Sequence, residues 1–161
     1  MKLKISQYIA LLLLLLVTGT FWGTWFTLTR SLETFSAQEF IHIGKTIIAN
    51  VAWPMRVIMP LAIAFVILSL WWYPDKRSAG FYVCLLAGAL LVITLLITVG
   101  IEVPIDNEIK QWSASVLPGN WEEIRDRWKV FHAIRTLTAV ASFACFSGAV
   151  LFGSSEGPSI Y

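Results

Sequence analysis

RDRWKVFHAIRT, residues 125–136, decides the fold, because it joins a charged, aromatic stretch to an apolar segment long enough to cross a membrane. The chain continues from it into 20 uncharged residues, Thr136–Ser155. Of the 22 charged residues (12 Lys and Arg, 10 Asp and Glu), 11 fall between Glu102 and Arg135. Charged and histidine side chains at the edge of a membrane helix are energetically costly. This region is therefore the first candidate for function.

Composition places the whole chain in the membrane class. It is 57% hydrophobic and 14% charged, with a mean hydropathy of +0.72, outside the usage of soluble domains. A helix needs about 20 apolar residues to cross a bilayer, and four uncharged runs reach or approach that length: Ile5–Thr29 (25 residues), Val57–Tyr73 (17), Ser78–Ile101 (24) and Thr136–Ser155 (20). We predict an all-α, polytopic membrane protein: one domain over residues 1–161, an antiparallel four-helix transmembrane bundle with two helical loops on one side. The spans are expected near residues 5–29, 53–73, 78–101 and 130–155.

The first span has some features of a signal peptide. Lys2 and Lys4 precede the leucine run at residues 11–16. The bulky sequence at residues 18–22 lacks a small-residue cleavage site, however, and apolar sequence continues to Thr29. A retained membrane helix is the better interpretation.

Charge also bears on partners and on orientation. The net charge of +2 without a basic run argues against nucleic acid, so membrane lipid is the expected surrounding. The Lys-rich start and the short turn with Lys76 and Arg77 favour cytoplasmic termini in the inner membrane of a bacterium. A plain count of basic residues on each side favours the opposite orientation.

The first long connection is predicted to be helical. Ser36 and Glu39 form a capping-box pattern, and apolar residues then recur at helical spacing at Phe40, Ile43, Ile47 and Val51. This amphipathic helix is expected to end near Trp53, because the residue before Pro54 is disfavoured in helical geometry.

The second long connection is also predicted to be helical. Pro104 is expected to open a short helix, which ends at the Leu117-Pro118-Gly119 break. Asn120 with Glu123 is then expected to cap a last helix of about 30 residues that runs into the fourth span.

Side chains from three spans are expected to meet at one depth. On the last helix, three- and four-residue steps place Arg125, Trp128, His132 and Arg135 on one face. Aligning the third and fourth spans by helical rise puts Glu102 level with His132 and Arg135. The other candidates that approach this cluster are Arg56, Asp106, Asn107, Trp112 and Trp121.

Two interpretations of this cluster remain open. The acidic, basic and histidine groups between tryptophans could hold a flat aromatic molecule and move a proton. Alternatively, Arg135 only neutralises Glu102, His132 caps that network and the tryptophans anchor the membrane interface. The cysteines, Cys84 and Cys145, lack metal-ligand spacing, and no metal site is predicted.

The residues of this cluster also carry a family resemblance. The pattern E-V-P-I-D-N-x-I-x-x-W, followed by W-x-x-x-R-x-R-W-x-x-F-H-x-x-R-T, resembles the anthrone-oxygenase-like family of small four-helix membrane proteins. That family usually shows V-P-x-N near the end of its third helix and W-x-x-x-N-x-x-R at the opening of its fourth. Val103-Pro104 and Arg135 match, whereas Asp106 and His132 stand where Asn is common. These departures favour a polar site over an obligatory catalytic histidine.

The resemblance implies oxygenation of an aromatic, anthrone-like substrate without a cofactor. On that basis Asp106, His132 or Glu102 would act as base, and Arg135 with Arg125 would stabilise an enolate. Trp112, Trp121 and Trp128 would stack on the substrate.

Two other classes of function remain open. The chain could be a non-enzymatic accessory subunit or small-molecule binder in a larger membrane complex or homo-oligomer. Its small-residue ladders, such as Gly80, Cys84 and Gly88, would let helices approach closely. Less favoured is a haem or quinone binder that uses His132 and His42.

Overall fold

The computed structural model describes residues 1–113 and 115–153, and within them the chain folds into helices joined by turns, with no strand. Four helical segments are long and apolar enough to cross a membrane: Lys2–Thr34, Ala37–Trp71, Ala79–Gln111 and Trp121–Phe152. The all-α fold and the four spans are therefore confirmed. The predicted end of the fourth span, at Ser154 and Ser155, lies outside the described residues.

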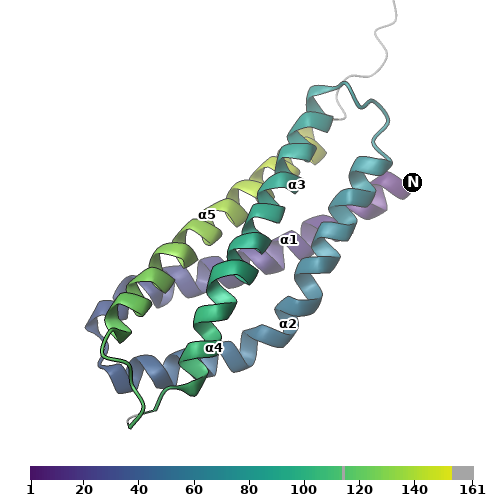
Figure 1. The fold of residues 1–161 in the computed structure, drawn as a ribbon. Helices are drawn as coiled ribbons and strands as arrows, with labels where there is room; N and C mark the ends of the chain where they lie inside the picture. Colours follow the sequence, from purple (N-terminus) through teal and green to yellow (C-terminus); the bar gives the residue numbers. More distant parts are fainter. Residues whose placement is uncertain (114, 154–161) are drawn as a thin grey trace, which may run out of the picture.

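The bundle is built from long rods with connections at its two ends (Figure 1). The elements in chain order are α1 (Lys2–Thr27), the 3₁₀ helix η1 (Thr29–Thr34), α2 (Ala37–Trp71), α3 (Ala79–Ile97), the π-helical turn η2 (Thr98–Glu102), α4 (Val103–Gln111) and α5 (Trp121–Phe152). The N-terminus and the short α2–α3 turn lie at one end of the bundle. The η1 segment and the α4–α5 connection lie at the other.

The first connection does not form a separate loop helix, which corrects one prediction. The capping box is present: Ser36 Oγ accepts a hydrogen bond from the Glu39 backbone, and Glu39 accepts one from the Ser36 backbone at 2.8 Å. The helix does not end near Trp53 but continues through Pro54 and Pro60 to Trp71. Each proline removes one backbone hydrogen bond, yet membrane helices tolerate prolines where neighbouring helices support them. Contacts along the bundle thus outweigh the local preference for a break.

The third span likewise continues past its predicted end. The α3 helix, the η2 turn and α4 form one rod from Ala79 to Gln111, so the helix that Pro104 opens is the last part of this rod. Pro104 lies just after the π-helical turn inside this continuous rod, so its missing N–H removes one backbone hydrogen bond at the junction. The π-helical turn just before it ends at Glu102, which is fully buried. Such turns are frequent at functional sites.

The last helix begins where the sequence predicts. It spans 32 residues from Trp121 to Phe152, close to the expected length, and Asn120 is its N-cap residue. The Asn120 side chain does not form the predicted capping hydrogen bond.

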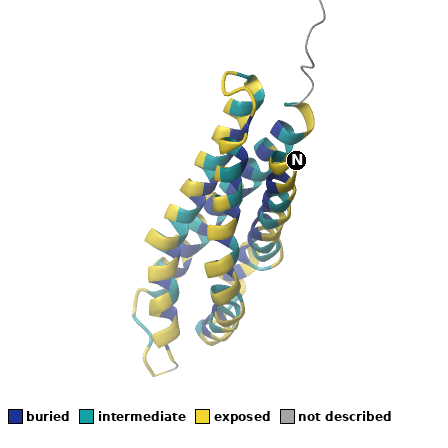
Figure 2. Cartoon of the chain, turned by 90° about the vertical axis from the view of Figure 1, so that its right-hand side faces the viewer, coloured by how far each residue is buried: buried dark blue, intermediate teal, exposed yellow. Residues whose placement is uncertain are grey.

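Buried residues face the inside of the bundle along every rod, and most residues on the outer faces are exposed (Figure 2). One apolar cluster fills the half near the N-terminus and includes Leu14, Val66, Leu91 and Phe146. Hydrogen bonds between helices also occur in this half. Ser142 Oγ donates to the Ala87 carbonyl oxygen at 2.8 Å, and the hydroxyl oxygens of Thr94 and Thr138 lie 2.9 Å apart. Interhelical hydrogen bonds of this kind hold helices together where water is absent.

A second cluster fills the opposite end. It joins the first half of α2 to α4 through Phe40, Ile41, Ile105 and Ile109. The two segments that the sequence assigns to helical loops therefore pack together. The polar site lies between the two clusters.

Candidate active site

A cavity of about 310 Å³ lies between the helices. Every long rod contributes to its wall, which is mostly apolar. The polar and charged side chains on it are Thr20, Thr24, Arg56, Thr98, Asp106, Lys110, His132 and Arg135. A mostly apolar pocket with a few convergent polar groups is the usual form of a small-molecule site.

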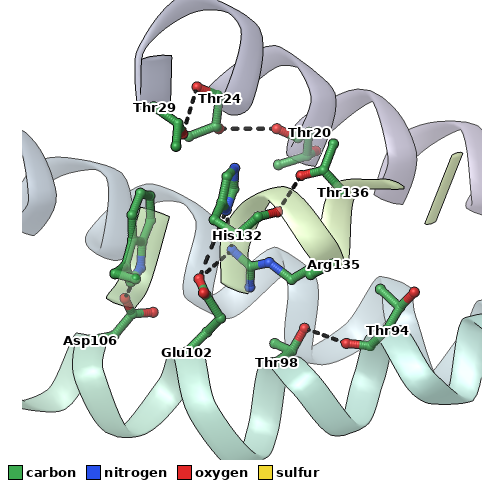
Figure 3. Close-up of polar contacts among 11 residues, drawn as sticks. Thr20, Thr24, Thr29, Thr94, Thr98, Glu102, Asp106, His132, Arg135 and Thr136 are labelled. Carbon is green, nitrogen blue, oxygen red and sulfur yellow. Dashed lines mark hydrogen bonds and ion pairs between the residues drawn. The ribbon is translucent and has the colours of Figure 1, made fainter. Parts of the chain in front are cut away.

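The deepest charged pair beside this cavity is Glu102 and Arg135. Glu102 is 0% exposed and Arg135 is 8% exposed. Arg135 Nη2 lies 2.9 Å from Glu102 Oε2. Figure 3 shows the two side chains pointing toward each other. The predicted alignment of the third and fourth spans, which places Glu102 level with Arg135, is therefore confirmed. A buried carboxylate is stable only beside a positive charge or strong donors, and Arg135 supplies the charge.

Arg135 also fixes the state of the neighbouring histidine. Its Nη2 lies 2.7 Å from His132 Nδ1. A guanidinium group only donates, so Nδ1 must accept and the ring proton belongs on Nε2. Glu102 Oε2 lies 3.8 Å from the same Nδ1. His132 therefore offers Nε2–H as a donor, and the imidazole is neutral in this arrangement.

Trp128 links His132 to Asp106. Its indole lies nearly parallel to the imidazole, with ring centroids 4.8 Å apart and an angle of 8°. The indole Nε1 donates a hydrogen bond to Asp106 Oδ1 at 3.2 Å. Asp106 Oδ2 accepts no hydrogen bond from any described residue. Asp106 Oδ2 is therefore a carboxylate oxygen on the cavity wall that can accept a further hydrogen bond.

Helix α1 completes the enclosure from the opposite side. Phe21 meets the His132 ring edge-on, with centroids 6.3 Å apart. The Arg135 guanidinium carbon lies 4.4 Å from the centre of the same phenyl ring. Cation–π contacts of this kind are attractive, especially away from water. The aromatic side chains hold the polar groups in place and exclude water from them.

Several polar atoms of the cluster are left without a partner. Among the described residues, the buried atoms Glu102 Oε1, His132 Nε2 and Arg135 Nε make no hydrogen bond of normal geometry, and Glu102 Oε2 is held only by the ion pair. Buried polar atoms without partners are rare and costly. Their concentration in one cluster marks it as a candidate functional site.

Arg56 and Asn107 occupy different surroundings. Arg56 lies on the cavity wall and forms no ion pair or hydrogen bond with the described part of the chain. Asn107 is exposed and accepts a hydrogen bond from Lys110 at 3.0 Å. It does not line the cavity.

The remaining candidates lie at the α4–α5 end, away from the cavity wall. Trp112 and Trp121 both pack on Phe40, with centroid distances of 6.3 Å and 6.0 Å. The Arg125 guanidinium carbon lies 5.2 Å from the Trp121 ring centre, and its Nε contacts Asp126 at 2.9 Å. The structure places these three residues in the packing of the bundle end.

Sequence reasoning missed the contribution of α1. Thr20, Phe21 and Thr24 line the cavity, and Phe21 touches both His132 and Arg135. Thr20 and Thr24 are one helical turn apart in a mostly apolar span, and this spacing is a signal that could have marked this face.

The two histidines do not converge. His42 is exposed and borders a separate surface hollow with Gln38 and Lys45, whereas His132 is buried at the cavity. They are therefore not placed to ligate one haem iron. Within the described ranges, no group of three or more His, Cys, Asp or Glu side chains could hold a metal ion.

Comparison with known proteins identifies one family. The family model described as anthrone oxygenase matches residues 49–145, more than half of the chain. The match includes the cavity residues from Val51 to Arg135, on the later part of α2 and on α3, η2, α4 and α5, but not those of α1, η1 or the first part of α2. No curated protein and no solved structure matches the chain.

Proposed function

The chain belongs to the anthrone oxygenase family, and from that premise we propose that it oxidises an anthrone-like aromatic with dioxygen, without a cofactor, inside the membrane. The observation that carries the proposal is the cavity of about 310 Å³, on whose wall Asp106, His132 and Arg135 meet. The cavity lies at the lower end of the usual range for small-molecule sites, about 300–1,000 Å³. Its walls are apolar and aromatic, as a flat fused-ring substrate requires.

The reaction needs only a base and a site for negative charge. Removal of a proton from the anthrone methylene carbon gives an enolate, which passes one electron to dioxygen. The resulting radical pair combines into a hydroperoxide at that carbon. Loss of water, by removal of the remaining C–H proton and cleavage of the O–O bond, leaves the second ketone. One anthrone and one dioxygen thus yield one anthraquinone and one water.

Asp106 is the base in this proposal. Its carboxylate faces the cavity, and Oδ2 has no hydrogen-bond donor among the described residues. Trp128 holds the other oxygen, which fixes the direction of the free one. A general base must reach the proton that it removes, and Asp106 is the carboxylate on the cavity wall.

Arg135 and His132 are the groups that stabilise the enolate oxygen. Arg135 brings a fixed positive charge, and His132 offers an Nε2–H that makes no hydrogen bond of normal geometry with the described residues. Donors arranged before the reaction in a site without water are worth more than the same donors in solution. Glu102 does not line the cavity and is paired with Arg135. We assign it a positioning role.

The alternative is a binder or accessory subunit that uses the same cavity without chemistry. The unpaired polar atoms at the cavity favour the enzyme. The two are separated by turnover, because a binder would retain the aromatic molecule unchanged.

The test is oxygen uptake by purified protein in lipid nanodiscs with anthrone as substrate. We expect uptake above the spontaneous rate, equal amounts of oxygen consumed and anthraquinone formed, and one oxygen-18 atom in each quinone made under oxygen-18 gas. Arg135→Gln should abolish the excess rate, and this variant is assayed at a temperature at which its thermal melt shows the bundle to be folded. A wild-type rate equal to the spontaneous rate would refute the enzyme and favour the binder.

We also propose that the protein resides in the inner membrane of a bacterium, with both termini in the cytoplasm. Lys2 and Lys4 before the apolar span support this orientation. Fusions of a periplasmic reporter enzyme to Met1 and to the α4–α5 connection test it. Activity of the Met1 fusion would show that the N-terminus lies in the periplasm, which is the opposite orientation.

A further inference from the structure

The rods α2 and α3–α4 touch near both of their ends. At one end Gly44 faces Ile109 so closely that an added methyl group would lie 3.3 Å from the isoleucine Cγ2. At the other end a methyl group added at Gly88 would lie 3.3 Å from Val66 Cγ1. Between these two contacts, α2 contains Pro54 and Pro60 and the opposite rod contains the π-helical turn. Both features interrupt regular helix packing.

The cavity reaches the surface in this middle region. Arg56 and Pro60 on α2, and Val99 and Val103 on the opposite rod, line the cavity and are also exposed. These four residues surround an opening of the cavity on the side of the bundle, which we call the lateral mouth. Side chains next to the mouth are apolar and exposed, among them Leu61 at 43% and Leu96 at 65%. A surface of this composition at the middle of a membrane helix faces lipid.

Arg56 is an isolated cation at this mouth. It forms no ion pair or hydrogen bond in the described part of the chain, and its neighbour Val57 is exposed and apolar. A charged side chain in a membrane span without a partner is costly, and such residues commonly mark ligand paths. An anionic or acidic group on an entering ligand would supply the missing partner.

We propose that the ligand enters the cavity laterally from the bilayer between Arg56 and Val99, and that Arg56 binds an acidic hydroxyl group on it. The ligand class is a flat, lipid-soluble aromatic that carries a phenolic or enolic hydroxyl. The nearly parallel Trp128–His132 pair and Phe21 supply aromatic walls for the rings, and the cavity volume of about 310 Å³ suits a small molecule rather than a phospholipid. The proposal rests on the proposed function, because it concerns the substrate of the same cavity.

The first experiment asks whether the mouth opens to lipid or to water. A nitroxide spin label is placed at Val99→Cys in a background with Cys84→Ala and Cys145→Ala, in lipid nanodiscs. Control labels are placed at Val92, an exposed apolar site on α3, and at Glu108, an exposed polar site on α4. We expect the Val99 label to respond to dissolved oxygen more than to a water-soluble nickel chelate, as at Val92. A response like that at Glu108 would overturn lateral entry.

The second experiment narrows the mouth and measures binding of a hydroxyanthraquinone by stopped-flow fluorescence. Val99→Trp should slow association by about tenfold or more, because it obstructs access to the site. Val92→Trp adds the same side chain to α3 away from the cavity and should leave the association rate unchanged. Equal association rates for wild type and Val99→Trp would overturn the portal.

The third experiment tests the role of Arg56. Arg56→Gln should weaken binding of the hydroxyanthraquinone by about tenfold, the usual worth of a charge-assisted hydrogen bond. It should not change binding of anthraquinone, which lacks the hydroxyl group. Arg56→Lys should bind the hydroxyanthraquinone more tightly than Arg56→Gln but less tightly than the wild type. Equal losses for both molecules would overturn the assignment of Arg56.

These outcomes separate the portal from the catalytic proposal. Binding that depends on Val99 and Arg56, without oxygen uptake, would refute the oxygenase and retain the portal. Oxygen uptake by the wild type, together with an association rate unchanged in Val99→Trp, would retain the oxygenase and refute the portal. Failure of the wild type to bind either anthraquinone would overturn the proposed ligand class.

Discussion

Trp128 donates its indole N–H to Asp106 Oδ1 across 3.2 Å, from α5 to α4. The same indole lies against the imidazole of His132. A single side chain thus holds the proposed base and one proposed enolate-stabilising group in a fixed relation. Catalysis depends strongly on such placement, so Trp128 should matter for rate more than for folding.

Trp128→Phe tests this role. The variant keeps an aromatic ring next to His132 but loses the donor to Asp106. Loss of one hydrogen bond to a carboxylate is worth about 1.5–3 kcal/mol, so we expect anthrone turnover to fall by about tenfold to a hundredfold. The melting temperature should also fall because Trp128 is buried in the core, so turnover is measured at a temperature at which both proteins are folded. Trp53→Phe, at a tryptophan that is 71% exposed, is the matched control; equal losses of turnover in both variants would contradict the prediction.

Asp106→Asn tests the base. Asparagine keeps an oxygen for Trp128 but cannot accept the substrate proton. Turnover should fall by about 100- to 10,000-fold, while hydroxyanthraquinone binding persists. Asp126→Asn removes an exposed carboxylate bonded to Arg125, outside the cavity, and should retain turnover. Full activity of Asp106→Asn in the oxygen-uptake assay would exclude Asp106 and return the role to Glu102 or His132.

Glu102→Gln and Arg135→Met test the buried ion pair. Each single change leaves one buried charge without its partner, which is expected to lower the free energy of unfolding by about 3–5 kcal/mol. The double variant removes both charges and should be less destabilised than the sum of the single variants. Reversible unfolding in detergent measures the four proteins of this cycle. The two charges lie 2.9 Å apart. If the loss of unfolding free energy in the double variant equals the sum of the losses in the single variants, the two charges do not stabilise each other.

His132→Phe and His132→Gln separate the ring from its N–H. Phenylalanine keeps the contact with Trp128 but offers no donor, whereas glutamine offers an amide N–H without the ring. If the Nε2–H stabilises the enolate, turnover by His132→Phe should be about 100- to 1,000-fold below that of the wild type. Turnover by His132→Gln should fall less. The comparison is made by oxygen uptake at saturating anthrone. The reverse order would indicate that ring packing, not hydrogen bonding, is what His132 contributes.

Gly80→Ala tests helix packing at the end of the bundle opposite the α4–α5 connection. Gly80 approaches Gly153, and an added methyl group would overlap the Tyr73 hydroxyl and lie 2.8 Å from the Gly153 Cα. Overpacking of this kind costs about 1–3 kcal/mol, so a lower melting temperature is expected. Gly148 has nothing within 4 Å, and Gly148→Ala should be neutral or slightly stabilising. Equal melting temperatures for the two variants would contradict the close approach.

The sequence alone determined the class of fold and the depth of the central pair. Uncharged runs of membrane length define the spans, because hydrocarbon tolerates few charges. A constant rise per residue in neighbouring helices is enough to place Glu102 level with Arg135, and the structure confirms it. The three- and four-residue steps from Trp128 to His132 and Arg135 also predicted their common face, and all three are buried.

Only the tertiary structure decided which candidates reach the cavity and where the helices end. Local preference predicted a break near Trp53, but packing along α2 carries the helix through Pro54. Trp112 and Trp121 carry the same chemistry as Trp128, yet they pack behind the wall residue Phe40 and do not line the cavity. Phe21 enters the site from a span about 100 residues away. Periodicity describes one helix at a time, whereas rotation about each axis and the choice of neighbour depend on the packing of all the rods together.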